Sequence, residues 1–331
     1  MKIMVYEARP DERADLEKQA ALHGVELSVT DAVPTLENAS LAAGCIGVSI
    51  LGQGCIDAAL LDAYHALGIR YLSTRTIGYD HIDLDHARSI GLRVCSASYA
   101  PNGVADFTVM MILMCLRHYK QALWRGQVND FSLIGLQGRE MKDLTIGIIG
   151  TGRIGAQVAR NLSGFGCRIL AYDLRRNPAV EPQVTYVDFD TLLAQSDVIT
   201  LHMPLLDSNR HIINRESIAK MRDGVVIVNC SRGELADIEA LIEGIETGKI
   251  GALGMDTVEG DEGIIHADHR VDILPNRNWF YLHQFRNVIM TQHMAFYTDA
   301  AVSSMVDCGI GGICQMAAGE SCPTELTGPV Q

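Results

Sequence analysis

Short runs of apolar residues alternate with longer amphipathic segments along almost the whole chain. The first series has its apolar runs at residues 2–8, 25–30, 46–51, 69–75 and 92–97. The second series has them at residues 144–150, 167–173, 197–204, 225–231, 251–256 and 287–293. Nearly continuous apolar runs separated by helix-length segments predict parallel strands whose two faces are covered by helices.

Two such series predict an α/β protein with two domains of the Rossmann-like or flavodoxin-like type, each with a parallel sheet, and a cleft between them. With 331 residues the chain is long enough for two hydrophobic cores. A turn-like start at residues 100–103 and the apolar residues up to 120 predict a connecting helix, and residues 300–320 predict a helix that returns to the first domain. The expected domains comprise residues 1–100 plus 299–331 and residues 101–298.

Composition excludes several classes of partner. The formal net charge of −13, without a Lys/Arg-rich run, argues against nucleic acid, because phosphate binding requires a basic face. The longest apolar stretch, residues 103–116, carries Asp106 and is shorter than the roughly 20 residues of a membrane helix. We therefore expect no membrane contact and, since the first residues lack a signal-peptide pattern, a cytoplasmic protein. Nine scattered cysteines without a CxxC pair predict neither a disulfide framework nor a metal site.

A glycine-rich turn follows the apolar run at residues 144–150 and precedes a helical segment. It has the pattern GxGxxG over residues 150–155, in which the expected cofactor contacts are Gly150, Gly152, Arg153, Ile154 and Gly155. Glycines at these positions permit a tight turn and a close approach of the backbone to a pyrophosphate, which the N-terminus of the helix stabilises. The turn therefore predicts a dinucleotide cofactor.

Asp173 ends the next apolar run, 18 positions after the third glycine (173 − 155). A carboxylate there accepts hydrogen bonds from a ribose 2′-hydroxyl and repels a 2′-phosphate. The sequence thus predicts NAD as the cofactor, bound by the 101–298 domain. Arg175 and Arg176 are near enough to leave NADP as the alternative.

Candidate catalytic residues follow three later apolar runs of the second series. They are Arg232, the acidic segment from Asp256 to Glu262, and His293. Ligands of open α/β sheets bind at the carboxyl ends of the strands, where these residues are expected. Hydride transfer to a 2-oxo acid requires a cation for the carboxylate and an acid that protonates the forming alkoxide. Arg232 and His293 can supply these two groups.

Several motifs occur in an order that is similar to the D-isomer-specific 2-hydroxyacid dehydrogenase family, over essentially the full chain. They are TRTIGYDHID, SYAPNGVADFT, GTGRIG, LHMPL, NCSRGELAD, MDTVEGDEG and QHMAFYTDAAV. The 32 positions between Asp261 and His293 (293 − 261), and the AFYT that follows, resemble the D-lactate dehydrogenase branch. That branch includes the D-lactate-forming enzymes of vancomycin resistance and the D-2-hydroxyisocaproate dehydrogenases. The resemblance implies reduction of pyruvate to D-lactate by NADH, a fermentation reaction, with the 1–100 and 299–331 domain binding the substrate.

The same resemblance implies roles for individual residues. Arg232 binds the substrate carboxylate and 2-oxo group, and His293 is the proton donor in reduction. Asp261 occupies the position of a family glutamate that pairs with the histidine, although its side chain is one methylene shorter, and Glu262 is the alternative partner. Gln292 replaces the proline that usually precedes the histidine.

Further contacts are implied for both ligands. Substrate contacts are Ile77, Gly78, Tyr99, Arg232 and Phe296, bordered by Ile50, Leu51 and Gln53. Cofactor contacts beyond the glycine turn and Asp173 are Met203, Pro204, Asn209, Cys230, Ser231, Arg232 and Asp256. Of these, Asp256 is expected to face the nicotinamide amide.

Other interpretations stay open. The same chemistry on a larger acid, such as 2-oxoisocaproate, phenylpyruvate or 2-oxoglutarate, fits the same motifs. A non-catalytic regulatory protein that senses NAD is the alternative that the unusual Asp261 favours. The apolar residues 109–116, together with the resemblance, predict a homodimer.

Overall fold

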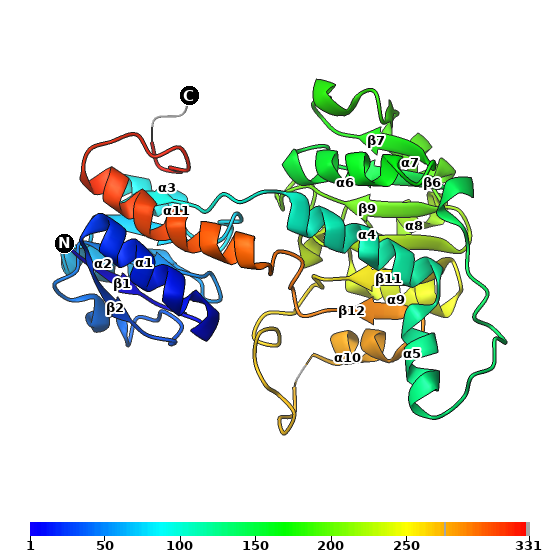
Figure 1. The fold of residues 1–331 in the computed structure, drawn as a ribbon, viewed down its shortest axis with the longest axis horizontal. Coiled ribbons are helices and arrows are strands. Elements are labelled where there is room, and N and C mark those ends of the chain that lie inside the picture. The colour runs from blue at the N-terminus through cyan, green and yellow to red at the C-terminus, as the bar shows by residue number, and fades with distance from the viewer. Residues whose placement is uncertain (275, 329–331) are drawn as a thin grey trace. The chain divides into compact units, whose positions relative to one another are not determined.

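The computed structural model describes residues 1–274 and 276–328, which fold into two compact units (Figure 1). One unit consists of Met1–Ala100 and the described part of Tyr297–Gln331, and the other of Pro101–Phe296. The chain thus crosses between the units after Ala100 and after Phe296, whereas the sequence placed the second crossing after residue 298. Residues 329–331 of the expected first domain lie outside the described residues.

The first unit is built on a parallel five-stranded sheet of order β2-β1-β3-β4-β5. Its strands are β1 Lys2–Val5, β2 Glu26–Val29, β3 Gly47–Ile50, β4 Tyr71–Thr74 and β5 Arg93–Cys95. Its α-helices are α1 Arg13–His23, α2 Ala58–Ala66, α3 Leu84–Ser89 and α11 Asp299–Ala317. Alternate residues of the strands face two separate apolar clusters, so helices cover both faces of the sheet.

The C-terminal helix α11 packs beside α1 and against β3, β4 and β5 (Figure 1). Among the described residues it is the one helix that is long and apolar enough to cross a membrane by length and composition alone. Half of its apolar stretch is buried within the first unit. Its apolar residues, such as Val306 and Ile310, pack on Ile3 and Val5 of β1, as in a core helix.

The second unit is built on a parallel seven-stranded sheet of order β12-β11-β10-β9-β6-β7-β8. Its strands are β6 Thr145–Ile149, β7 Arg168–Tyr172, β8 Thr185–Tyr186, β9 Val198–Leu201, β10 Val225–Asn229, β11 Ile250–Met255 and β12 Val288–Met290. Its α-helices are α4 Asn102–Leu116, α5 Tyr119–Gln127, α6 Arg153–Ser163, α7 Phe189–Gln195, α8 Arg215–Lys220, α9 Ile238–Glu246 and α10 Arg277–Gln284. Helices α4 and α6 lie side by side on one face of the sheet, and a large apolar core lies under α7, α8 and α9 on the other.

Two entirely parallel sheets confirm the predicted α/β class and both series of strands. The sequence did not predict the two-residue edge strand β8. The predicted helix up to residue 120 is shorter than expected, because His118 has a left-handed backbone (φ 50°) that ends α4 at Leu116 and starts α5. The sheet order reverses between β6 and β9, and ligands of such sheets bind beside that switch point.

Candidate active site

The glycine-rich turn joins β6 to α6 at the switch point of the seven-stranded sheet. Gly150 has φ 94°, and a Cβ there would be 2.5 Å from the carbonyl oxygen of His202. A Cβ on Gly155 would be 2.0 Å from the carbonyl oxygen of Gly150, so both positions require glycine. At Gly152, in contrast, a Cβ would meet no atom of the described chain within 4 Å. The turn therefore leaves open space beside the N-terminus of α6, which fits the pyrophosphate of a dinucleotide.

Asp173 follows β7 and lies next to this turn. One carboxylate oxygen accepts hydrogen bonds from the Thr151 backbone N–H at 2.6 Å and from its hydroxyl at 3.1 Å. The other accepts from the backbone N–H of Arg175 at 2.9 Å. The guanidinium of Arg176 lies 5.5 Å from the centre of the Tyr186 ring. Asp173 thus combines a fixed orientation with negative charge where the adenosine ribose of a dinucleotide is expected.

One side-chain hydrogen bond joins the segments after β9 and β10, and another lies within the segment after β9. Asn209 donates to the carbonyl oxygen of Pro204 at 2.8 Å, and the Ser231 hydroxyl donates to that of Met203 at 2.6 Å. Cys230 is buried, and burial raises the pKa of its thiol. The structure therefore places these residues, predicted as cofactor contacts, in two adjacent loops at the carboxyl edge of the sheet.

Arg232 begins the turn after β10. The buried side chain of Asn229 donates a hydrogen bond to the backbone carbonyl oxygen of Arg232 at 2.7 Å and accepts one from the N–H of Ser231 at 3.0 Å. The Arg232 guanidinium donates to the carbonyl oxygen of Ser231 at 2.9 Å. Sequence reasoning missed Asn229, whose amide fixes the loop that carries the arginine.

His293 lies just after β12, in a segment that Asp256 holds in place. The Asp256 carboxylate is 1% exposed and accepts three hydrogen bonds. Its donors are the Thr291 hydroxyl at 2.6 Å and the backbone N–H groups of Met294 at 2.9 Å and Ala295 at 2.8 Å. His293 has a left-handed backbone (φ 52°), which is uncommon outside glycine. The sequence placed Asp256 at the nicotinamide; the structure adds that it fixes the residues on both sides of His293.

Asp261 lies in the loop after β11. Its carboxylate accepts a hydrogen bond from the backbone N–H of Val258 at 3.2 Å. Burial raises the pKa of Asp261 to about 6, and the neighbouring carboxylates of Glu234, Glu262 and Asp256 act in the same direction. A carboxyl group with this pKa changes charge close to the range in which histidine titrates.

Glu259 is the third acidic residue of the same loop, and it has other partners. Its carboxylate lies 2.7 Å from Nε2 of His211 and 3.7 Å from the guanidinium of Arg210. These contacts tie Glu259 to the segment after β9. The candidate carboxylate partners of His293 thus stay Asp261 and Glu262, as the sequence left them.

His266 was not singled out by the sequence, yet it lies against His293. Its Nε2 atom is 3.2 Å from the backbone carbonyl oxygen of His293, and the two ring centroids are 6.1 Å apart. Phe296, predicted to border the substrate, has its ring centroid 6.5 Å from each of the two imidazoles. Both histidines belong to segments without regular periodicity, so no pattern in the sequence could pair them.

Ile77, Gly78 and Tyr99 belong to the first unit. Ile77 and Gly78 follow β4, and the Thr76 hydroxyl donates a hydrogen bond to the carbonyl oxygen of Gly78 at 2.6 Å. The backbone N–H of Ala97, two residues before Tyr99, donates to the carbonyl oxygen of Thr76 at 2.9 Å. The two segments therefore lie next to each other at the carboxyl edge of the five-stranded sheet.

The neighbouring loop after β3 is fixed by Glu7, which is buried and has φ 54°. One Glu7 oxygen accepts from the backbone N–H of Leu51 and from that of Gly52 at 2.8 Å, and the other from that of Gln53 at 2.8 Å. Leu51 and Gln53 were expected to border the substrate side chain. The sequence gave no signal for Glu7, whose partners are more than 40 positions away.

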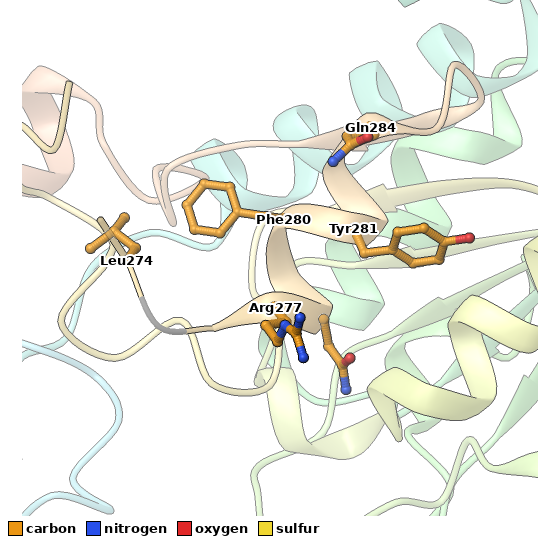
Figure 2. Close-up of a pocket in the computed structure, with 6 residues that line it drawn as sticks. Leu274, Arg277, Phe280, Tyr281 and Gln284 are labelled. Carbon is orange, nitrogen blue, oxygen red and sulfur yellow. The ribbon is translucent and has the colours of Figure 1, made fainter. Parts of the chain in front are cut away.

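Two surface hollows of the second unit contain none of the predicted site residues. The first lies over α10 and is lined by Leu274, Arg277, Asn278, Phe280, Tyr281 and Gln284. Figure 2 shows Phe280 and Tyr281 on opposite sides of that helix. The second is lined by Asp106, Val109, Met110, Leu113, Met114 and Asn161, on α4 and α6. Within the described ranges, no group of three or more His, Cys, Asp or Glu side chains is arranged to hold a metal ion.

Known proteins resemble this chain over most of its length. Residues 109–295 match the family model described as D-isomer specific 2-hydroxyacid dehydrogenase, NAD binding domain. The chain is 42% identical to an aromatic 2-oxoacid reductase of Clostridium sporogenes over 93% of each sequence, and 39% identical to a D-lactate dehydrogenase of Lactobacillus delbrueckii subsp. bulgaricus over 92% of each. Its fold matches the solved structure of a D-isomer specific 2-hydroxyacid dehydrogenase from Lactobacillus delbrueckii ssp. bulgaricus in its NAD-complexed form, with a TM-score of 0.82. The two sequences are 30% identical, and the match covers 98% of this chain and 100% of the Lactobacillus chain. These matches confirm the predicted cofactor, NAD.

Proposed function

Since the chain belongs to the D-isomer-specific 2-hydroxyacid dehydrogenase family, we propose that it reduces a 2-oxo acid to the D-2-hydroxy acid, with pyruvate and D-lactate as the first candidate pair. It is an NAD-dependent oxidoreductase. The observation that carries the proposal is that the buried carboxylate of Asp256 accepts hydrogen bonds from the backbone N–H groups of Met294 and Ala295, next to His293. A histidine whose neighbours in the chain are fixed in this way, at the same sheet edge as Arg232 and the glycine turn, is suited to proton transfer during hydride transfer.

The proposed mechanism assigns the binding of the acid to Arg232 and the proton transfer to His293. NADH supplies the hydride when it is bound. The planar guanidinium of Arg232 binds the carboxylate and polarises the 2-oxo group, a bidentate task for which lysine is a poor substitute. Protonated His293 donates its proton to the 2-oxo oxygen as negative charge develops there, and neutral His293 accepts it in the reverse direction.

Asp261 is the proposed partner of the His293 imidazole. Its carboxylate favours the protonated imidazole, because an opposite charge nearby stabilises the charged form. The Asp261 side chain is one methylene shorter than glutamate, so its loop must come closer to His293 for the two groups to pair. Glu262, at the next position, is the alternative partner of His293. Ile77 and Gly78 are the proposed second contact of the substrate carboxylate, through their backbone N–H groups.

A larger 2-oxo acid is the second candidate substrate. Two observations favour it: the 42% identity to proteins named aromatic 2-oxoacid reductase, and the three rings of His266, His293 and Phe296. Aromatic rings favour other aromatic rings at centroid distances of about 4.5–7 Å. The reaction and its catalytic groups are the same for both candidates.

We also propose that the protein is a homodimer. Helix α5 and the segment after it expose large apolar side chains, among them Trp124 at 65%, Phe131 at 78% and Leu133 at 83%. Large apolar side chains that are exposed close together in the sequence are what a surface covered by a second copy of the chain would present. Light scattering of the purified protein tests this proposal: twice the chain mass supports it, and a monomer refutes it.

Initial rates of NADH oxidation test the proposed reaction. Pyruvate, 2-oxoisocaproate, phenylpyruvate and 2-oxoglutarate are compared, each also with NADPH. Turnover of at least one of them with NADH is expected, with a D-configured product. A regulatory NAD sensor, in contrast, would bind NADH without turning over any of the four acids, and that result would refute the enzymatic proposal.

A further inference from the structure

The His266 side chain contacts His293 in two ways: its ring lies 6.1 Å from the His293 ring, centroid to centroid, and its Nε2 atom lies 3.2 Å from the His293 backbone carbonyl oxygen. Nε2 of His266 donates a hydrogen bond to the backbone carbonyl oxygen of His293 when that nitrogen carries a proton. The planes of the two rings are inclined by 39°, and both residues have a left-handed backbone, with φ of 62° and 52°. The exposed loop of His266 is thereby anchored to the residue that we propose as the proton donor.

Phe296 completes this aromatic cluster of three residues. Its ring is inclined by 74° to His266 and by 82° to His293, close to the edge-to-face arrangement that aromatic pairs prefer. The substrate oxygen must lie within about 3 Å of a nitrogen of His293 for proton transfer. A substituent on the next carbon of the substrate therefore lies within a few ångströms of the His293 ring, where the other two rings are in reach.

The charge around the cluster distinguishes between kinds of substituent. Asp261 and Glu262 lie in the same loop as His266, and the pKa of Asp261 is raised in part by the carboxylates around it. Further negative charge is unfavourable next to carboxylates that already repel one another. An uncharged planar ring adds nothing to this repulsion, whereas the second carboxylate of 2-oxoglutarate would add to it.

We propose that His266 is a specificity-determining residue, whose ring forms with Phe296 the surface that receives an aromatic side chain of the 2-oxo acid. The inference rests on the proposed function and assigns to one residue the choice between pyruvate and acids such as phenylpyruvate. The methyl group of pyruvate is too small to use this surface. His266 therefore sets the ratio of the two kcat/KM values rather than the rate with pyruvate.

Two substitutions separate the ring from the hydrogen bond. His266→Phe keeps an aromatic ring but removes the donor to His293, and His266→Gln keeps a donor but removes the ring. Both replace a histidine at the same left-handed position, so strain in the loop affects them alike. His269→Gln is the matched control, since His269 lies three residues further along and bonds to Asp272 through Nδ1 at 2.8 Å.

The expected result is a loss of about 5- to 10-fold in the phenylpyruvate to pyruvate ratio of kcat/KM for His266→Gln, as for the loss of one aromatic contact. His266→Phe and the control are expected to keep the ratio within about twofold. An unchanged ratio in His266→Gln would overturn the inference, as would an equal loss of the ratio in His266→Phe.

Calorimetric titration of D-phenyllactate and D-lactate into the NADH complex gives the same comparison without turnover. Weaker binding of D-phenyllactate to His266→Gln, with D-lactate unaffected, supports the role of His266 even if neither oxo acid is reduced. The failure of the proposed reaction and the failure of this inference therefore give different results. Equal binding of D-phenyllactate to the wild-type protein and to His266→Gln refutes the inference.

Discussion

Replacing Asp256 with asparagine removes the charge from the group that fixes the His293 segment. The carboxylate is 1% exposed and accepts hydrogen bonds from Thr291, Met294 and Ala295 at 2.6–2.9 Å. An asparagine can keep its oxygen toward Thr291 and Met294, but its NH2 group then faces the N–H of Ala295, donor against donor. One hydrogen bond to a charged acceptor is lost, which costs about 1.5–3 kcal/mol.

The kinetic consequence follows from the left-handed backbone of His293, which is less favourable for residues other than glycine by roughly 1–2 kcal/mol. When Asp256 no longer fixes the residues beside it, the segment can relax and the imidazole is aligned in fewer molecules. Since about 1.4 kcal/mol corresponds to a factor of ten in rate, we expect kcat for pyruvate reduction by Asp256→Asn to fall about 10- to 100-fold. Steady-state kinetics at saturating NADH measure this change.

Asp197→Asn is the matched control for Asp256→Asn. Asp197 immediately precedes β9, so it lies at the amino edge of the same sheet, whereas Asp256 lies at the carboxyl edge. The Asp197 carboxylate accepts a hydrogen bond from the Thr145 backbone N–H at 2.9 Å and pairs with Arg139 at 2.8 Å. Urea denaturation should show a similar loss of unfolding free energy in both variants, whereas kcat of Asp197→Asn should stay within about twofold. An Asp256→Asn variant with normal kcat and only a raised KM for NADH would refute the positioning role and favour the nicotinamide contact.

Three further perturbations have defined outcomes. Burial raises the pKa of Asp261 to about 6, so its negative charge is lost as the pH falls through that value. In a pH–rate profile, the kcat/KM of the wild-type protein should therefore decline below about pH 6. Asp261→Asn should lack this decline and be less active than the wild-type protein at pH 7. Asp173→Asn should improve kcat/KM with NADPH relative to NADH about tenfold or more, because the repulsion of a 2′-phosphate is removed; an unchanged ratio would contradict the assignment. Arg75 and Glu12 form a fully buried ion pair at 2.9 Å. Arg75→Met should therefore lower the unfolding free energy, measured in urea, by about 3–5 kcal/mol, and the additional change Glu12→Leu should restore part of this loss. A loss below about 1 kcal/mol in Arg75→Met would show that the pair is dispensable.

Local patterns were sufficient to predict much of the nucleotide-binding unit. The strand before Gly150, the helix after it and Asp173 at the end of the next strand are determined by residues close in sequence. Arg232 and His293 could be placed at one sheet edge because each follows an apolar run. The structure has all of these elements where the sequence placed them.

Long-range pairing could not be predicted in the same way. The bonds from Asp256 to residues 294 and 295 depend on the register of β11 and β12, in which Met255 lies opposite Met290. His266 lies in a loop without regular periodicity, and its contact with His293 depends on the left-handed backbone of both residues. Such contacts form only in the folded chain, and neither apolar periodicity nor a short motif predicts them.

The most direct test of the proposed reaction follows the hydride and the proton donor together. Pyruvate, or phenylpyruvate if it is the better substrate, is reduced with NADH that carries deuterium at the transferred C4 position, and the product is resolved by chiral chromatography and mass spectrometry. The proposed mechanism predicts one deuterium at C2 of the D-hydroxy acid, formed at a rate that falls at least about 100-fold in His293→Ala, since general acid catalysis contributes roughly 10²- to 10⁴-fold. An L-configured product, a product without the label, or an undiminished rate in His293→Ala would contradict it.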